Sequence, residues 1–224
     1  MRRFIDLRVA PGKGRLDEFV ARARELGYSG LGVTGHPVGP QPQGVDLVTR
    51  LDLAPANQQQ LVDQLNRHRR GFTVLAVSCA TKAVARQAAK DHRVDILRFP
   101  RGDGSPAWMD RQQAQLAVGS HCLYEVDAQE LMIRDPARLE VALALIRREL
   151  GNARGHGVPV VLSSGARSPQ EMRDPRSMAS LMDLVGVGEE EALGMVSDTP
   201  WRLVERNRDK LSGAYLLPGV TRVE

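Results

Sequence analysis

The sequence contains few of the residues that build disulfide scaffolds, metal centres and most side-chain active sites. Its 224 residues include two cysteines, five histidines and 4% aromatic residues. Cys79 and Cys122 lie in separate apolar runs without CxxC spacing, so we expect buried free thiols and no zinc site. The longest apolar runs are far shorter than the roughly 20 residues of a membrane span.

Several motifs that would define a familiar active site are also missing. The chain has no Walker loop, and Ser163-Ser164-Gly165 is not a GxSxG elbow. No secretory signal is found, because a short strand-like run, 4–9, follows the first residues directly. We therefore expect a soluble, cytoplasmic protein with little capacity for side-chain catalysis of its own.

Positive charge is carried almost entirely by arginine. Of the 31 basic residues only four are lysine, and the net charge is +4. A guanidinium recognises phosphate through two parallel hydrogen bonds, so the bias is compatible with nucleic-acid binding. A GC-rich genome or a heat-adapted surface explains the bias alone more simply.

Short apolar runs alternate with helical patterns along most of the chain. This alternation predicts one α/β domain over residues 1–212, folded as a TIM-barrel-like (β/α) barrel, and an extended tail over 213–224. The expected strands are Phe4–Val9, Gly30–Thr34, Val45–Leu53, Phe72–Ser78, Asp95–Arg98, Leu123–Val126 and Val158–Leu162. The expected helices are Leu16–Leu26, Asn57–Arg70, Lys82–Lys90, Asp110–Val118, Pro136–Arg154, Ser177–Val185, Glu189–Ser197 and Pro200–Lys210.

Cations recur where these strands end or shortly after. Strand carboxyl ends meet at one rim of a barrel, so the cations could form a basic surface for a phosphate backbone. The predicted RNA-binding residues are Arg8, Lys82, Arg98, Arg101, Arg167, Arg173 and Arg176. The alternative for each is solvation or a local ion pair with acids such as Asp95, Asp103 or Asp174.

Metal chemistry is the second possibility at the same rim. Metal-dependent phosphoesterases place histidines and carboxylates at successive strand ends. This chain offers only Asp6, His36 and Glu125 there, which is too few for a multi-metal centre. His36 before Pro37 is more simply a loop residue, and the other histidines make poor bases, so a metal-dependent phosphoesterase is the weaker alternative.

Several segments occur in a fixed and specific order along the chain. The most specific is Val160-Val-Leu-Ser-Ser-Gly-Ala166 followed by Met172-Arg-Asp-Pro-Arg176, and Asp95–Pro100 and Val196–Pro200 add to it. In these segments the chain resembles the ribonuclease P protein component 3 family, whose members are archaeal relatives of the thirty-kilodalton subunit of nuclear ribonuclease P and MRP. The resemblance implies a barrel related to the polymerase-and-histidinol-phosphatase (PHP) metal hydrolases but without their metal chemistry. Gly165 and Arg167 stand where those hydrolases carry Asp and His.

The resemblance also implies a function and partners. The family supplies a protein subunit of ribonuclease P, the ribonucleoprotein that removes the 5′ leader of precursor tRNA. The RNA with Mg²⁺ performs the hydrolysis, so this chain is expected to bind no cofactor. Expected partners are ribonuclease P RNA, precursor tRNA within the holoenzyme, other ribonuclease P proteins, and the small ferredoxin-like component 2 in a heterodimer or heterotetramer. A structural scaffold without RNA contacts of its own is a third possibility.

Overall fold

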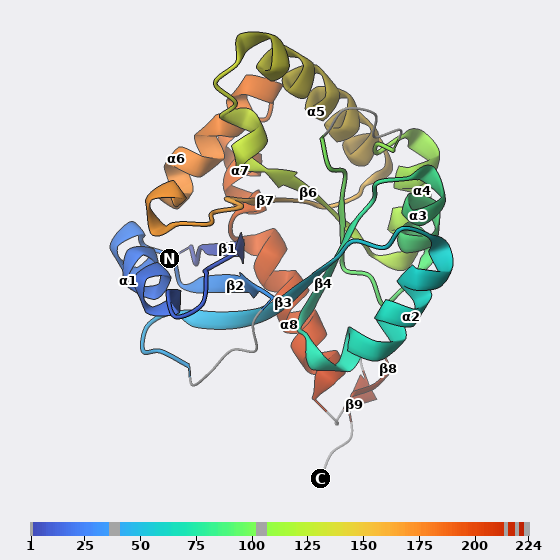
Figure 1. Cartoon of the computed structure of the whole chain (residues 1–224), viewed down its shortest axis with the longest axis horizontal. Coiled ribbons are helices and arrows are strands. Elements are labelled where there is room, and N and C mark those ends of the chain that lie inside the picture. The colour runs from blue at the N-terminus through green and yellow to red at the C-terminus, as the bar shows by residue number, and fades with distance from the viewer. Residues whose placement is uncertain (1, 36–40, 102–106, 213–214, 218–219, 222–224) are drawn as a thin grey trace.

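The computed structural model describes residues 2–35, 41–101, 107–212, 215–217 and 220–221, and helices surround a barrel of strands (Figure 1). The barrel strands are β1 (Ile5–Val9), β2 (Gly30–Thr34), β3 (Asp46–Leu53), β4 (Val74–Ser78), β5 (Ile96–Arg98), β6 (Leu123–Asp127) and β7 (Val160–Ser163). The helices are α1 (Leu16–Leu26), α2 (Gln58–His68), α3 (Lys82–Lys90), α4 (Arg111–Ser120), α5 (Pro136–His156), α6 (Pro175–Ser180), α7 (Glu189–Met195) and α8 (Asp198–Leu211).

The strands pair in sequence order, and every pairing from β1 to β7 is parallel. The two edge strands then approach each other. Val9 bridges to Ala166 in parallel, the Ala10 amide donates to the Ala166 carbonyl at 2.8 Å, and the Gly165 amide donates to the Arg8 carbonyl at 3.1 Å. This seam nearly closes the sheet, which confirms the predicted TIM-barrel-like fold.

Each of the seven predicted strands is present within two residues of its expected bounds. All but one of the predicted helices also lie within two residues of their expected bounds. The segment 177–185 divides into α6, which starts earlier because Asp174 caps it and Pro175 occupies its first turn, and a 3₁₀ helix, Leu181–Val185. The last helix begins at Asp198, two residues before Pro200. In place of a wholly extended tail, Tyr215–Leu217 (β8) pairs antiparallel with Val220–Thr221 (β9).

Apolar residues form two buried layers. The larger layer lies between the strands and the surrounding helices and includes Phe19, Leu61 and Ile146. The smaller layer fills the amino-terminal half of the barrel and closes on Trp201, Leu203 and Val204 of α8. Helix α8 therefore plugs the end of the barrel where the strands begin. Its inner partners are Ile5, Leu7, Val48, Val74, Ala76, Ile96, Leu123 and Val161.

The two cysteines are free and buried, as predicted. Burial raises the pKa of Cys79 well above its ordinary value and that of Cys122 to about 12. Both thiols therefore stay protonated at neutral pH. Among the described residues, no helix is both long and apolar enough to cross a membrane.

Gly32 allows β1 and β2 to approach closely, since a Cβ atom there would lie 2.1 Å from the Leu7 carbonyl oxygen. We expect Gly32→Ala to lower the free energy of unfolding by about 3 kcal/mol or more, because backbone atoms must separate. Gly119→Ala on α4 is the control, with no atom within 4 Å of the added carbon, and should raise it by roughly 0.5–1 kcal/mol. Urea denaturation measures both values, and equal stability of the two variants would contradict the assignment.

Candidate nucleic-acid interface and the charged barrel interior

The carboxyl-terminal half of the barrel is filled by charged side chains. At its centre, Arg50 of β3 meets Glu125 of β6 in a two-pronged ion pair, with Nη1 2.6 Å from Oε1 and Nη2 2.7 Å from Oε2. Neither side chain is exposed to solvent. The Arg50 Nη1 also donates to the Leu7 carbonyl at 3.0 Å, and the Ser163 hydroxyl donates to Glu125 Oε1 at 2.7 Å.

Further ion pairs surround this one. Arg50 Nε lies 2.7 Å from Asp52 Oδ1, and Arg8 Nε lies 3.2 Å from Asp52 Oδ2. Arg8 also pairs with Asp127, and Arg98 Nε lies 3.1 Å from Glu125 Oε2. We call this set of three guanidiniums and three carboxylates the charge network; its members are Arg8, Arg50, Arg98, Asp52, Glu125 and Asp127. Its formal charges cancel.

The ionised forms of the central pair are strongly favoured. Burial raises the pKa of Glu125, but attraction and hydrogen bonds from Arg50, with help from Arg98 and Arg8, outweigh it and bring that pKa down to about 2. Burial lowers the pKa of Arg50, and the charges of Asp52 and Glu125 more than reverse this. Both groups are therefore charged throughout the physiological pH range.

Asp6 is buried beside the seam and is less well satisfied. Its Oδ1 accepts from the Ser164 amide at 3.1 Å and from the Arg8 amide at 3.2 Å, whereas Oδ2 has no hydrogen-bond partner in the described structure. Burial raises the pKa of Asp6 to about 6, although the bonds from Ser164 and Arg8 oppose it. Asp6 thus supports the backbone where β1 meets β7.

The residues of the hypothetical metal site do not fit a metal ion. Glu125 is engaged by two arginines and a serine, so a cation would have to displace them. His36 lies outside the described residues. Within the ranges that the structure describes, no group of three or more His, Cys, Asp or Glu side chains is arranged to hold a metal. We therefore derive no reaction step through a metal at this rim.

The seven predicted RNA-binding residues fall into two groups. Arg8, Arg98 and Arg101 have side chains only 14–18% exposed, and all three are engaged in ion pairs. Arg101 pairs with Glu130 at 2.8 Å and with Glu149, which also accepts from the Tyr124 hydroxyl. These three do not form part of an exposed basic rim, because carboxylates inside the protein neutralise them. RNA contact by them stays a prediction.

The other four predicted residues, Lys82, Arg167, Arg173 and Arg176, are exposed. Arg167, Arg173 and Arg176 share the segment between β7 and the first turn of α6, and we call them the β7–α6 arginines. None of them makes an ion pair within the described part of the chain, and the nearby Asp174 instead caps α6 through the Arg176 and Ser177 amides. Lys82 begins α3, which lies on the opposite side of the barrel from α6 in Figure 1.

The Ser163–Ala166 segment proves to be a structural seam. Its residues are buried, and only Arg167 after it reaches solvent. Gly165 has φ +64°, and a Cβ atom there would lie 2.6 Å from Asp127 Oδ1. Glycine is therefore required both by the backbone turn and by the charge network.

A second cluster of cations lies at the opposite end of the barrel and was not predicted from the sequence. Arg202, Arg206 and Lys210 follow one another at four-residue spacing on α8, which is the signal that could have revealed one basic helix face. Burial lowers the pKa of Lys210, as do the charges of Arg206 and Arg69, and only Asp95 acts against them. Positive charge is thus incompletely compensated around this helix.

Comparisons with known proteins agree with the geometry. The family model described as RNase P subunit p30 matches residues 3–212. Ribonuclease P protein component 3 of Methanosarcina barkeri is 31% identical over 209 residues, covering 89% of this chain and 87% of that protein. The protein of the same name from Methanococcoides burtonii is 28% identical, with 98% and 93% covered.

Solved structures show the same fold. A chain in the cryo-EM structure of archaeal ribonuclease P with mature tRNA superposes with a TM-score of 0.83 at 18% identity, covering 98% of both chains. The A. niger ochratoxinase barrel superposes with a TM-score of 0.59 at 11% identity, covering 91% of this chain and 71% of that one.

Replacing one member of the central ion pair should cost far more than replacing both. We expect Glu125→Gln to lower the free energy of unfolding at pH 7 by about 3–5 kcal/mol, because a buried guanidinium loses its main counter-charge. The double variant R50M/E125L should lose much less of the free energy of unfolding, because no buried charge of the pair is left alone. Since the folded-state pKa of Glu125 is depressed to about 2, its contribution is present above the unfolded value of 4.5 and disappears as pH falls from there toward 2.

Denaturation of both variants and the native chain between pH 3 and 7 measures these differences. A Glu125→Gln penalty that is independent of pH would contradict an ionised carboxylate at this position.

Proposed function

This chain belongs to the RNase P subunit p30 family, and on that premise we propose that it serves ribonuclease P as a non-catalytic, RNA-binding protein subunit. The match extends over residues 3–212, which includes the whole barrel, and this observation carries the proposal. The holoenzyme removes the 5′ leader of precursor tRNA, and the protein supports its catalytic RNA.

The barrel interior supports a non-catalytic role. Barrel enzymes assemble their active sites at the carboxyl ends of the strands. Here that position holds the charge network, in which Glu125 and Arg50 are fully paired and buried. A substrate phosphate would compete with carboxylates already bound to the guanidiniums. Hydrolysis and its Mg²⁺ are therefore assigned to the RNA, and this chain needs no cofactor of its own.

The outer surface supports RNA binding. The β7–α6 arginines are exposed and make no ion pair in the described structure, so they are available to neutralise phosphates of a folded RNA. Lys82 offers a separate contact on another side of the barrel. Arg8, Arg98 and Arg101 contribute less to RNA binding, since carboxylates inside the protein already neutralise their charge. A-form RNA is bound mainly through its backbone and shape, which suits scattered arginines better than a deep cleft.

The protein partner is proposed on the family resemblance. We assign the small ferredoxin-like component 2 as the direct partner, in a heterodimer or heterotetramer, with other ribonuclease P proteins completing the holoenzyme in the cytoplasm. Titration of this chain with component 2, followed by light scattering, measures the stoichiometry. Failure of the two proteins to associate would contradict the assignment of this partner.

Omitting the chain should impair the holoenzyme. Precursor-tRNA cleavage is measured with ribonuclease P RNA and its proteins at moderate Mg²⁺, with and without this chain. We expect a large loss of cleavage on omission and none by the chain alone, because the RNA carries the chemistry and the protein stabilises its active shape. Undiminished cleavage without the chain would remove the subunit proposal.

The β7–α6 arginines should account for part of the salt dependence of RNA binding. The triple variant R167A/R173A/R176A should bind ribonuclease P RNA more weakly. The slope of log K against log salt should fall by roughly 2–3 because up to three phosphate contacts are lost. Filter binding from 50 to 400 mM KCl, about an order of magnitude in salt, measures both quantities.

A matched control is R111A/R134A/R138A, which removes three exposed arginines that also make no ion pair in the described residues. An equal loss in both triple variants would mean that net charge alone governs binding and would contradict a localised RNA contact.

A further inference from the structure

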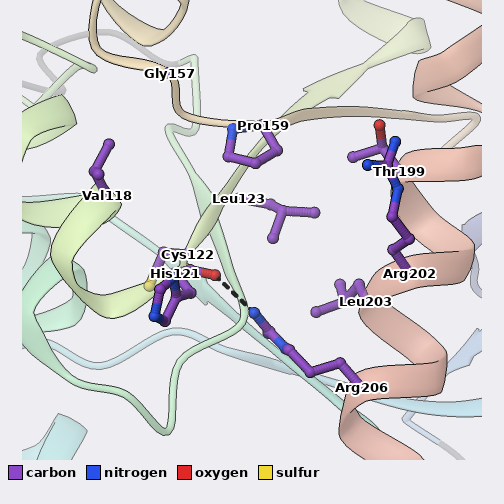
Figure 2. Close-up of a pocket in the computed structure, with 10 residues that line it drawn as sticks. All are labelled: Val118, His121, Cys122, Leu123, Gly157, Pro159, Thr199, Arg202, Leu203 and Arg206. Carbon is purple, nitrogen blue, oxygen red and sulfur yellow. Dashed lines mark hydrogen bonds between the residues drawn. The ribbon is translucent and has the colours of Figure 1, made fainter. Parts of the chain in front are cut away.

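A pocket opens at the amino-terminal end of the barrel, on the side away from the charge network. Its volume is about 300 Å³, near the lower end of the range for small-ligand sites. The ends of α4 and α5, the starts of β6 and β7, and one side of α8 surround it. The side chains of Leu123 and Leu203 point toward each other across its middle (Figure 2).

One part of the wall is apolar. Val118, Leu123, Pro159 and Leu203 provide it, and Val118 is 41% exposed although it is a large aliphatic side chain. The apolar surfaces of proline and leucine suit a planar ring better than an extended polar chain. This part of the pocket therefore fits a heterocyclic base.

The other part of the wall is cationic. Arg202 and Arg206 both project from α8 (Figure 2), and Thr199 lies in the first turn of the same helix. Arg206 donates to the His121 carbonyl at 3.2 Å and is 3.4 Å from Asp95, whereas Arg202 donates only through Nε to the Asp198 carbonyl at 3.2 Å. The two Nη groups of Arg202 thus have no partner in the described structure. Among the residues that the structure describes, no carboxylate lines the pocket.

His121 adds a ring at the mouth of the pocket. It caps the end of α4 with φ +61°, the one non-glycine residue with positive φ in the described part of the chain. Histidine tolerates this backbone conformation better than most residues. The conformation places the exposed imidazole of His121 at the edge of the cavity. Imidazole rings are among the side chains on which unstacked RNA bases lie.

We propose that this pocket receives one unstacked nucleotide of RNA, with the base between His121 and the apolar wall and the phosphate on Arg202. This inference rests on the proposed function, since an RNA subunit meets extruded bases in loops and bulges. Arg206 supplies a second positive charge and, through its bond to His121, holds the mouth in shape. Lys210, close to Arg206, would meet a flanking phosphate.

RNA fits the pocket better than a partner protein does. An acidic peptide side chain would use the guanidiniums but leave the apolar wall unfilled, and an apolar side chain would bury Arg202 without a counter-charge. A nucleotide satisfies both parts together.

Titration of the full chain with the four ribonucleoside 5′-monophosphates, their nucleosides and inorganic phosphate tests the proposal by NMR. We expect at least one monophosphate to bind about tenfold more tightly than its nucleoside and than phosphate. Arg202→Ala should weaken that binding about tenfold, and Val118→Trp should abolish it by filling the apolar part. Phosphate binding as tightly as every nucleotide would overturn the assignment of the base.

The controls are Arg138→Ala and Val141→Trp on α5, an exposed arginine and an exposed valine away from the pocket; both should bind as the native chain does. Circular dichroism confirms that each variant is folded. The same four variants are then cross-linked to ribonuclease P RNA carrying 4-thiouridine. Loss of one cross-link in the two pocket variants alone supports the proposal.

Unchanged cross-linking in the two pocket variants overturns the nucleotide-pocket proposal. The proposal is also overturned if the only defect of these variants is weaker association with component 2. Either result leaves the subunit function standing as long as omission of the chain still impairs cleavage.

Discussion

The ion pair between Arg50 and Glu125 is the interaction on which the rest of this structure depends. It joins β3 and β6, strands that are not neighbours in the sheet, across the inside of the barrel. Two fully buried charges are tolerable only because the geometry is two-pronged and the remaining lone pairs are bonded by Arg98 and Ser163. Closure at the Val9–Ala166 bridge holds the members of this network together.

The same network determines where function can reside. Arginines that enter the barrel are neutralised by carboxylates, and the space in which a barrel enzyme would bind its substrate is occupied. The cations that remain available to a partner lie on the outside of the barrel. They are the β7–α6 arginines at one end and those on the face of α8 at the other. A protein whose barrel arginines are paired with carboxylates, and whose surface arginines are not, is suited to hold a large anionic partner in shape.

Local sequence patterns predicted the barrel well because they depend on neighbouring residues alone. The apolar run of β7 is predicted within two residues, whereas the predicted start of α6, Ser177, lies after its Asp174 cap and Pro175. The arginines show the limit of this reasoning. Arg98 ends one strand and Arg167 follows another, yet Arg98 is bound to Glu125 and Arg167 is exposed. No local feature separates them, since the partner carboxylate is far away in the chain.

The sequence by itself determined the order of strands and helices, the single domain and the family, because periodicity, caps and motifs are properties of short segments. Only the tertiary structure decided which charges are paired, that Ser163–Ala166 is a seam, and that α8 closes the barrel with a pocket beside Arg202. The physical reason is that burial and ion pairing are set by side chains brought together from distant strands. A chain read in order cannot reveal those distances.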